Sequence, residues 1–299
     1  MSAATTPTSA NEFIEQQLNI RLATLEDVFE SDALCLVAPM GEPIDDLVRV
    51  MVEERRYRPD TRSPNLTVLL TTEGGFAETV QHIVETLRHH YDQVSFVIPR
   101  VAYSAGTVLA LSGDEIYMDY YARLGPIDPQ VATASGRWVP ALGYIAKWEE
   151  LVGKSKAGTL TEAELAVMAT FDLAELYYFE QAKKLAIMLV QKWLADYKFK
   201  DWTITETRGT PVDRRRRVQR AGQIARALSN PDRWHSHGHG ISRIVLDQEL
   251  QLKVNDLDAD PVRLKAVREY DGLLIDYMEK MRYSAMLHIV DRYRPLILG

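Results

Sequence analysis

The stretch VSFVIPRVAYSAGTVLALSGDEIYMD (94–119) decides the fold, because it reads as a strand, a turn, a helix and a second strand. Apolar and β-branched residues dominate 93–100 and 115–119, and the small residues after Ser104 open a helix over 104–113. Continuous apolar runs are typical of strands that are buried on both faces of a parallel sheet. We therefore expect an α/β core in which crossover helices connect parallel strands.

The same alternation precedes this stretch. Apolar runs predict strands over 33–40 and 64–72, and helical spacing predicts helices over 43–57 and 76–91. A pair of glycines, Gly74 and Gly75, follows the second of these strands. Ligand sites in such sheets lie outside the carboxyl ends of the strands. The glycine pair and Ser104 both follow such ends, so we single them out as candidate site residues.

The character of the chain changes after about residue 140. Helical patterns follow over 142–153, 161–197, 214–229 and 261–290, whereas 241–254 is ambiguous. The pattern over 161–197 is long for one globular helix, so we expect a kink or break in it. We divide the chain into a flexible segment (1–29), a catalytic core (30–160) and a mainly helical C-terminal extension (161–299). The extension is expected to pack on the core and to serve oligomerisation.

The composition of the chain limits which partners and which cellular locations are expected. The 299 residues carry 35 Lys and Arg against 42 Asp and Glu, a net charge of −7, which argues against nucleic acid or an anionic membrane as a partner. One cysteine, Cys35, rules out an intrachain disulfide and reads as a buried residue rather than a nucleophile. Without a signal-peptide pattern or a membrane-spanning apolar run, the expected location is the cytoplasm.

Ser104 has two interpretations. A serine at a strand-to-helix turn can become an exposed nucleophile, but a serine at a helix start is more commonly an N-cap, and A-Y-S-A-G is not G-x-S-x-G. The glycine pair favours the first interpretation, because an oxyanion hole needs two backbone N–H donors. Ala105 and either Gly74 or Gly75 fit those roles. The alternative for the glycines is a tight connection between strand and helix.

Several blocks occur together in this order: T-E-G-G (72–75), A-Y-S-A-G-T (102–107), D-E-I-Y-M (114–118) and G-P-I-D-P-Q (125–130). Over about residues 30 to 160 the chain resembles the Clp protease and signal-peptide-peptidase superfamily, and more narrowly its serine dehydrogenase proteinase branch. RWHSHGHGIS (233–242) is similar to the C-terminal part of that branch. The resemblance implies a Clp/crotonase-type fold of ββα units coiled into a superhelix. It also implies a homo-oligomeric serine peptidase acting on peptides or proteins.

The resemblance also bears on the base that Ser104 needs. Clp peptidases carry a histidine where this chain has G-P-I-D-P-Q, so a Ser-His-Asp triad of that type is not supported. Signal peptide peptidases use a lysine in a G-x-x-K segment, and here Gly153 opens such a segment that ends at Lys156, 52 residues after Ser104. The resemblance therefore implies a Ser104–Lys156 dyad, with Lys154 as the alternative base. A neutral lysine serves as a base when burial lowers its pKa.

One departure from the superfamily pattern lies beside the presumed oxyanion hole. Relatives commonly carry proline before the glycines, whereas this chain has Glu73. A carboxylate there opposes an oxyanion unless it points away or pairs with a cation such as Arg100. Two other functions therefore stay open: a crotonase-like acyl-CoA enzyme, which shares the oxyanion donors but needs no serine nucleophile, and an inactive assembly or binding protein.

Two further motifs are given structural rather than chemical roles. His235, His237 and His239 alternate as zinc ligands on a strand do, but the intervening glycines favour a loop, so we assign a structural or interface role. The basic run DRRRRVQR (213–220) reads as a solvated helix face that pairs with acidic neighbours. The sequence predicts no cofactor and no metal.

Overall fold

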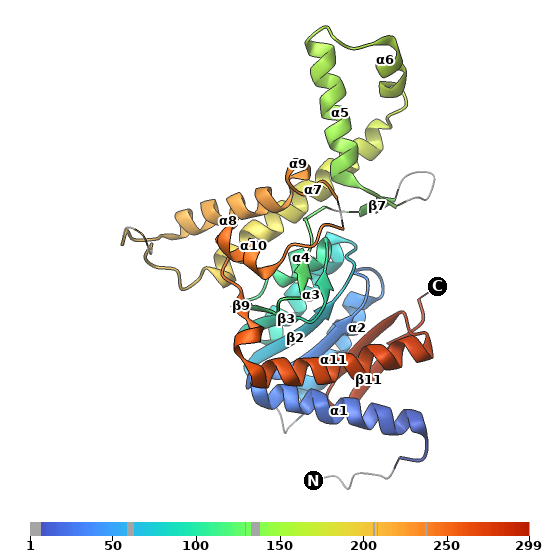
Figure 1. Ribbon diagram of the computed structural model, residues 1–299, viewed down its shortest axis with the longest axis vertical. Coiled ribbons are helices and arrows are strands. Elements are labelled where there is room, and N and C mark those ends of the chain that lie inside the picture. The colour runs from blue at the N-terminus through green and yellow to red at the C-terminus, as the bar shows by residue number, and fades with distance from the viewer. Residues whose placement is uncertain are drawn as a thin grey trace.

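The computed structural model describes residues 7–58, 63–128, 130–132, 138–205, 207, 209–236 and 238–298. Seven strands in this part of the chain form one sheet in the order β11–β10–β1–β2–β3–β5–β9 (Figure 1). Their bounds are β1 Asp32–Val37, β2 Asn65–Thr71, β3 Gln93–Ile98, β5 Glu115–Met118, β9 Asn255–Asp256, β10 Ala285–Ile289 and β11 Arg292–Leu296. The four central strands β1, β2, β3 and β5 are parallel, as the sequence predicts.

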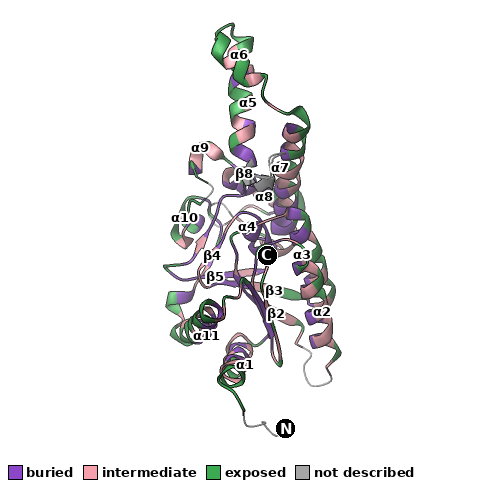
Figure 2. Cartoon of the chain, turned by 90° about the vertical axis from the view of Figure 1, so that its right-hand side faces the viewer, coloured by how far each residue is buried: buried purple, intermediate pink, exposed green. Residues whose placement is uncertain are grey.

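The central strands are buried on both faces, which explains their continuous apolar runs. In β1, Leu34 and Leu36 face a large core formed with α2 (Ile44–Tyr57), α3 (Ala77–His90), α4 (Ala105–Ala110) and α7 (Leu173–Trp193). Ala33 and Cys35 face the opposite core, formed with α1 (Ala10–Phe29) and α11 (Pro261–Met281). Figure 2 shows the two helical layers on either side of the strands.

The C-terminal half differs from its expected organisation. The 261–290 pattern ends as a helix at Met281, and Ala285–Ile289 continues as strand β10, antiparallel to β1. Strands β9, β10 and β11 thus complete the sheet of the N-terminal half, so residues 161–299 are not only a helical extension. The 161–197 pattern is broken as predicted, into α6 (Glu162–Met168), α7 and the π-helical turn η1 (Leu194–Lys198).

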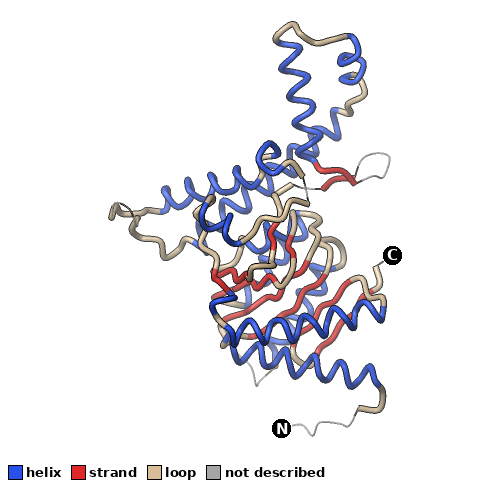
Figure 3. The backbone as a smooth tube through the Cα atoms, viewed as in Figure 1, coloured by secondary structure: helices blue, strands red, loops and turns tan. Residues whose placement is uncertain are grey.

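A helical arm projects from the body of the molecule (Figure 3). It consists of α5 (Ala141–Lys156), α6 and the first part of α7, and a small apolar cluster that includes Ile145, Leu176 and Phe179 holds α5 against α7. Helix α6 contributes no buried residue. The remaining elements are β4 (Val101–Ala102), β6 (Arg123–Leu124), β7 (Gln130–Ala132), β8 (Trp138–Pro140), α8 (Arg214–Leu228), α9 (Pro231–Trp234), α10 (Arg243–Gln248) and η2 (Leu257–Ala259).

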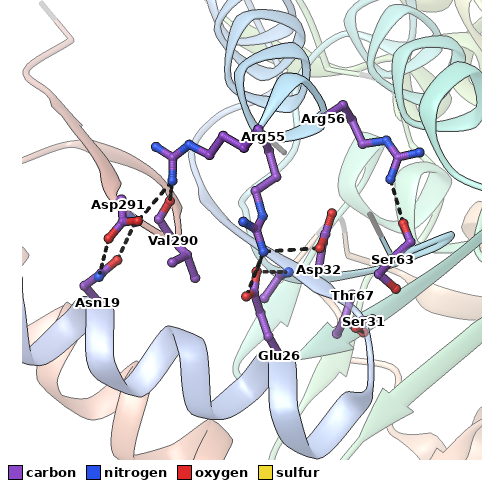
Figure 4. Close-up of polar contacts among 12 residues, drawn as sticks. Asn19, Glu26, Ser31, Asp32, Arg55, Arg56, Ser63, Thr67, Val290 and Asp291 are labelled. Atoms are coloured by element: carbon purple, nitrogen blue, oxygen red, sulfur yellow. Dashed lines mark hydrogen bonds and ion pairs between the residues drawn. The ribbon is translucent and has the colours of Figure 1, made fainter. Parts of the chain in front are cut away.

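A buried charge cluster joins α1, β1 and α2. The Arg55 guanidinium donates to Glu26 Oε1 and Oε2 at 2.8 and 2.9 Å and to Asp32 Oδ1 at 3.2 Å (Figure 4). Tyr91 donates its hydroxyl to Asp32 Oδ2 at 2.9 Å. The Arg55 side chain is only 3% exposed. Burial raises the pKa of Glu26 and of Asp32, and the arginine charge opposes that rise. Arg55 is therefore the counter-ion that these two carboxylates share.

We expect Arg55→Leu to lower the free energy of unfolding at pH 7 by about 3–5 kcal/mol, because it leaves both carboxylates without their cation. Their folded-state pKa values then rise further above the unfolded values near 4, so stability falls as pH rises through that window. The deficit relative to the unaltered protein is consequently smaller at pH 5 than at pH 7. Urea unfolding at the two pH values measures it.

Arg49 provides a matched control on the same helix. It pairs with Asp46 and Glu53 at the surface, and its side chain is 47% exposed. Arg49→Leu should therefore lower the stability far less than Arg55→Leu does, at either pH. Equal losses for the two variants would contradict the assignment of Arg55 as a buried counter-ion.

Candidate functional site

Ser104 lies at the turn between β4 and α4 in a conformation that is unusual for a serine. Its φ is 51° and its ψ is −116°, and such strain is typical of residues that a surrounding structure holds for a function. The side chain makes no capping hydrogen bond, although the residue occupies the N-cap position. Its hydroxyl instead donates to the Asp128 carbonyl at 2.8 Å. Ser104 thus lies at a strand–turn–helix junction without acting as a helix cap through its side chain.

The glycine turn approaches this serine closely. A Cβ placed on Gly74 would lie 2.8 Å from Ser104 Cβ, and one placed on Gly75 would lie 2.1 Å from the Met40 carbonyl oxygen. Both glycines have positive φ values, 109° and 146°. A residue with a side chain therefore fits neither position without a shift of the backbone. The structure brings this turn and Ser104, the candidates from the sequence, into contact.

The two glycines differ in what their N–H groups do. Gly74 donates to Thr72 Oγ1 at 3.0 Å. Met40 accepts from Phe76 and donates to the Gly74 carbonyl, both at 2.7 Å, so the N–H of Gly75 between them points away from Met40. Within the described residues, the N–H groups of Gly75 and Ala105 donate to no protein acceptor. Of the two glycines, Gly75 is thus the available donor beside Ala105, the first residue of α4.

The structure does not bring Lys156 to Ser104 within one chain. Asp128 accepts the Ser104 hydroxyl on its carbonyl and the Leu142 N–H on Oδ1, at 3.0 Å, so the first turn of α5 lies near the serine. Lys156 is the last residue of α5 and is exposed. With a rise of 1.5 Å per residue, about 21 Å of helix separates it from Leu142, far beyond the reach of a lysine side chain.

Lys154 lies on the same arm and is held as a cation. Its Nζ contacts Glu164 Oε1 at 2.5 Å and Glu150 Oε1 at 3.0 Å. These hydrogen bonds raise the pKa of Lys154, and the lysine lowers the pKa of Glu164 to about 2. A lysine base needs a lowered pKa, so Lys154 is the poorer candidate of the two.

Other groups near the serine were not foreseen from the sequence. Asp128 is buried, at 6% exposure, where Clp peptidases carry their histidine, and it offers Ser104 a backbone carbonyl. The segment after α9 lies beside β6, because Leu124 and Ile241 exchange backbone hydrogen bonds of 3.0 and 2.7 Å. A long-range pairing of this kind leaves no local signal in the sequence.

The histidines of that segment form no metal site in the described residues. His235 is an exposed residue at the end of α9, and His239 packs its ring on Trp234 at 5.4 Å between centroids. His237 lies outside the described residues. The structural or interface role expected of the segment stays a prediction.

Glu73 and Arg100 do not pair with each other. Arg100 donates from Nε to Asp271 Oδ2 at 2.8 Å, and Asp271 belongs to α11. Glu73 is exposed, and its charge lies close enough to Tyr103 to raise the pKa of that phenol, second to the effect of burial. The cation suggested for Glu73 from the sequence is therefore taken by another carboxylate.

Two further expectations can be compared with the structure. Cys35 is 2% exposed, and burial raises the pKa of its thiol to about 12, which excludes it as a nucleophile. Arginines of the basic run 213–220 are used within the chain: Arg214 pairs with Asp196 at 2.8 Å, and Arg217 donates to the Lys200 carbonyl. No described helix has the length and apolarity to span a membrane.

Known proteins resemble this chain at the level of a family and of individual relatives. Residues 40–208, more than half of the chain, match the family described as ClpP-like SDH-type serine proteinase. Two uncharacterized proteins of Methanocaldococcus jannaschii are similar to the chain. One is 28% identical over 62% of this chain and 64% of its own length. The other is 30% identical over 58% of this chain and 62% of its own length. The match thus spans less than two thirds of either relative.

Proposed function

Since this chain belongs to the family of ClpP-like SDH-type serine proteinases, we propose that it hydrolyses peptide bonds with Ser104 as nucleophile. The observation that carries the proposal is the conformation of Ser104, a buried non-glycine residue with a φ of 51°. Its hydroxyl makes no capping hydrogen bond to helix α4, although Ser104 is the N-cap residue of that helix. The closely packed glycine turn supports it, because peptide hydrolysis needs stabilised negative charge beside the nucleophile.

In this mechanism, Ser104 Oγ attacks the scissile carbonyl carbon and passes its proton to the base. The N–H groups of Ala105 and Gly75 donate to the resulting oxyanion, while Gly74 keeps Thr72 as its partner. The base then gives the proton to the amine as the C–N bond breaks. Water attacks the acyl-enzyme by the same route in reverse and releases the new carboxyl terminus.

We assign the base to Lys156 of a second copy of the chain. Exposed apolar side chains cover the arm that carries this lysine, among them Leu165 at 58% and Leu173 at 64% exposure. Packing of the arm against a neighbour would cover these side chains and desolvate the lysine, which lowers its pKa. The homo-oligomer expected from the sequence is thereby part of the proposed mechanism. A cytoplasmic location stays a prediction.

Digestion of fluorescent casein by the purified full-length chain tests the function. The proposal expects peptide products whose new termini are an amine and a carboxylate, identified by mass spectrometry. Acyl-CoA thioesters, offered in parallel, should be left intact. If the chain turns over a thioester but does not cleave casein, the crotonase-like function replaces the proposed peptidase function. If it turns over neither substrate, the result favours an inactive assembly or binding protein.

Gly75→Ala tests the oxyanion hole. The new Cβ would lie 2.1 Å from the Met40 carbonyl oxygen, so the turn must shift and move its donor. We expect kcat for peptide cleavage to fall by about 10²–10³-fold, the effect of losing one such donor. Gly272→Ala in α11 is the control, because its Cβ meets nothing within 4 Å. An unchanged kcat in a folded Gly75→Ala variant would place the oxyanion elsewhere.

A further inference from the structure

Glu73 lies next to the reacting centre. It directly precedes Gly74, whose Cβ position is 2.8 Å from Ser104 Cβ, and its carboxylate is exposed. Tyr103, the residue before the nucleophile, is half-buried, and its pKa is raised by burial and then by the Glu73 charge. The carboxylate therefore belongs to the residue next to the glycine that packs against the nucleophile, and it is open to solvent.

No cation of the described residues neutralises this carboxylate. Arg100 is taken by Asp271 at 2.8 Å. Arg123 donates from one guanidinium nitrogen to the Tyr120 and Ala122 carbonyls at 2.7 and 2.8 Å. Across the described part of the chain, Glu73 has neither a hydrogen bond nor an ion pair. An unpaired carboxylate thus lies one residue from the glycine that contacts Ser104.

Such a charge opposes the transition state unless the substrate supplies its counter-ion. A carboxylate repels an oxyanion at short range, and a cation placed between or beside them removes the repulsion and adds an attraction of its own. The effect is strongest in the transition state, because the oxyanion is absent from the bound ground state.

We propose that Glu73 makes the Ser104 site select peptides with a lysine or arginine side chain next to the scissile bond. This inference rests on the proposed function, since it names the substrate class of the same site. Glu73 then acts as a specificity residue that pairs with the substrate cation. Neutral peptides are cleaved more slowly, and peptides with an acidic side chain at this position are cleaved slowest.

The test uses three aryl aminoalkyl phosphonates that differ only in a lysine-like, a norleucine-like or a glutamate-like side chain. Rates of covalent labelling at Ser104 are followed by intact mass at low ionic strength. We expect the cationic probe to react about tenfold faster than the neutral probe in the unaltered protein. Glu73→Gln should reduce this ratio to within about twofold, and Glu73→Lys should favour the anionic probe. Because charges near the surface are screened, 1 M salt should also shrink the ratio.

Glu78→Gln is the matched control, since Glu78 is an exposed carboxylate five residues further on, in the first turn of α3. It should keep the cationic preference. A preference that survives in Glu73→Gln, or is absent from the unaltered protein, overturns the inference. If all three probes label Ser104 at equal rates, the inference about Glu73 is wrong, but the assignment of Ser104 as nucleophile still holds. If no probe labels Ser104, both the proposed function and this inference are contradicted.

Discussion

Ser104→Ala will lose peptide cleavage by at least about 10³-fold while remaining folded. The substitution removes the only atom that forms the acyl-enzyme in the proposed mechanism. It keeps a Cβ, so the positive φ of 51° and the packing against Gly74 are unchanged. The structural cost is the single hydrogen bond from the hydroxyl to the Asp128 carbonyl, about 1 kcal/mol. Casein cleavage and urea unfolding measure the two effects separately.

Ser112 separates the chemical role from the structural one. It is as buried as Ser104, at 1% exposure, and its hydroxyl also donates to a backbone carbonyl, that of Leu109 at 2.7 Å. Ser112→Ala should therefore show a similar change in unfolding free energy with full cleavage activity. Equal loss of activity in both variants would mean that cleavage reports on the stability of this region and not on a nucleophile.

Lys156→Ala will lower kcat by about 10²–10⁴-fold, the usual range for removal of a general base. Lys154→Ala will have a smaller effect, because Glu150 and Glu164 hold that lysine protonated. Since α5 carries Lys156 away from the serine of its own chain, mixing the inactive Ser104→Ala and Lys156→Ala chains should restore activity. A site that takes one residue from each chain is complete in about a quarter of random pairings.

The mixing experiment distinguishes the source of the base. Recovery near that fraction supports a lysine from the neighbouring copy. The alternative result is that both single variants are inactive alone and stay inactive after they are refolded together. That result would mean that Ser104 and Lys156 act within one chain, with the arm folded back onto the body. A fully active Lys156→Ala variant would contradict the lysine assignment itself.

The sequence predicted the centre of the sheet well and its edges poorly. Strands β1, β2, β3 and β5 are buried on both faces, so each leaves a continuous apolar run that a short window detects. The expectation of a flexible segment over 1–29 was wrong for Ala10–Phe29, which forms helix α1 and buries Leu18, Leu22 and Leu25 at helical spacing. The apolar run of β10 was read as the end of a helix, because its role as a strand depends on pairing with β1, far away in the sequence.

The candidate site was predictable where it depends on neighbouring parallel strands. Gly74 and Ser104 each follow the carboxyl end of a strand, and β2 pairs with β3, so their proximity follows from topology. The position of Lys156 was not predictable in this way. Its distance from Ser104 depends on the direction in which α5 leaves the body, and spacing along a sequence carries no information about that direction.

The central claim is that Ser104 is an activated nucleophile, and covalent labelling tests it most directly. The full-length protein and its Ser104→Ala variant are treated with a fluorophosphonate, and the intact mass and labelled peptide are measured. The account predicts one adduct per chain on Ser104 and none on the variant. An adduct at another residue, an equal adduct on the variant, or an unlabelled Ser104 in protein that cleaves casein would contradict it.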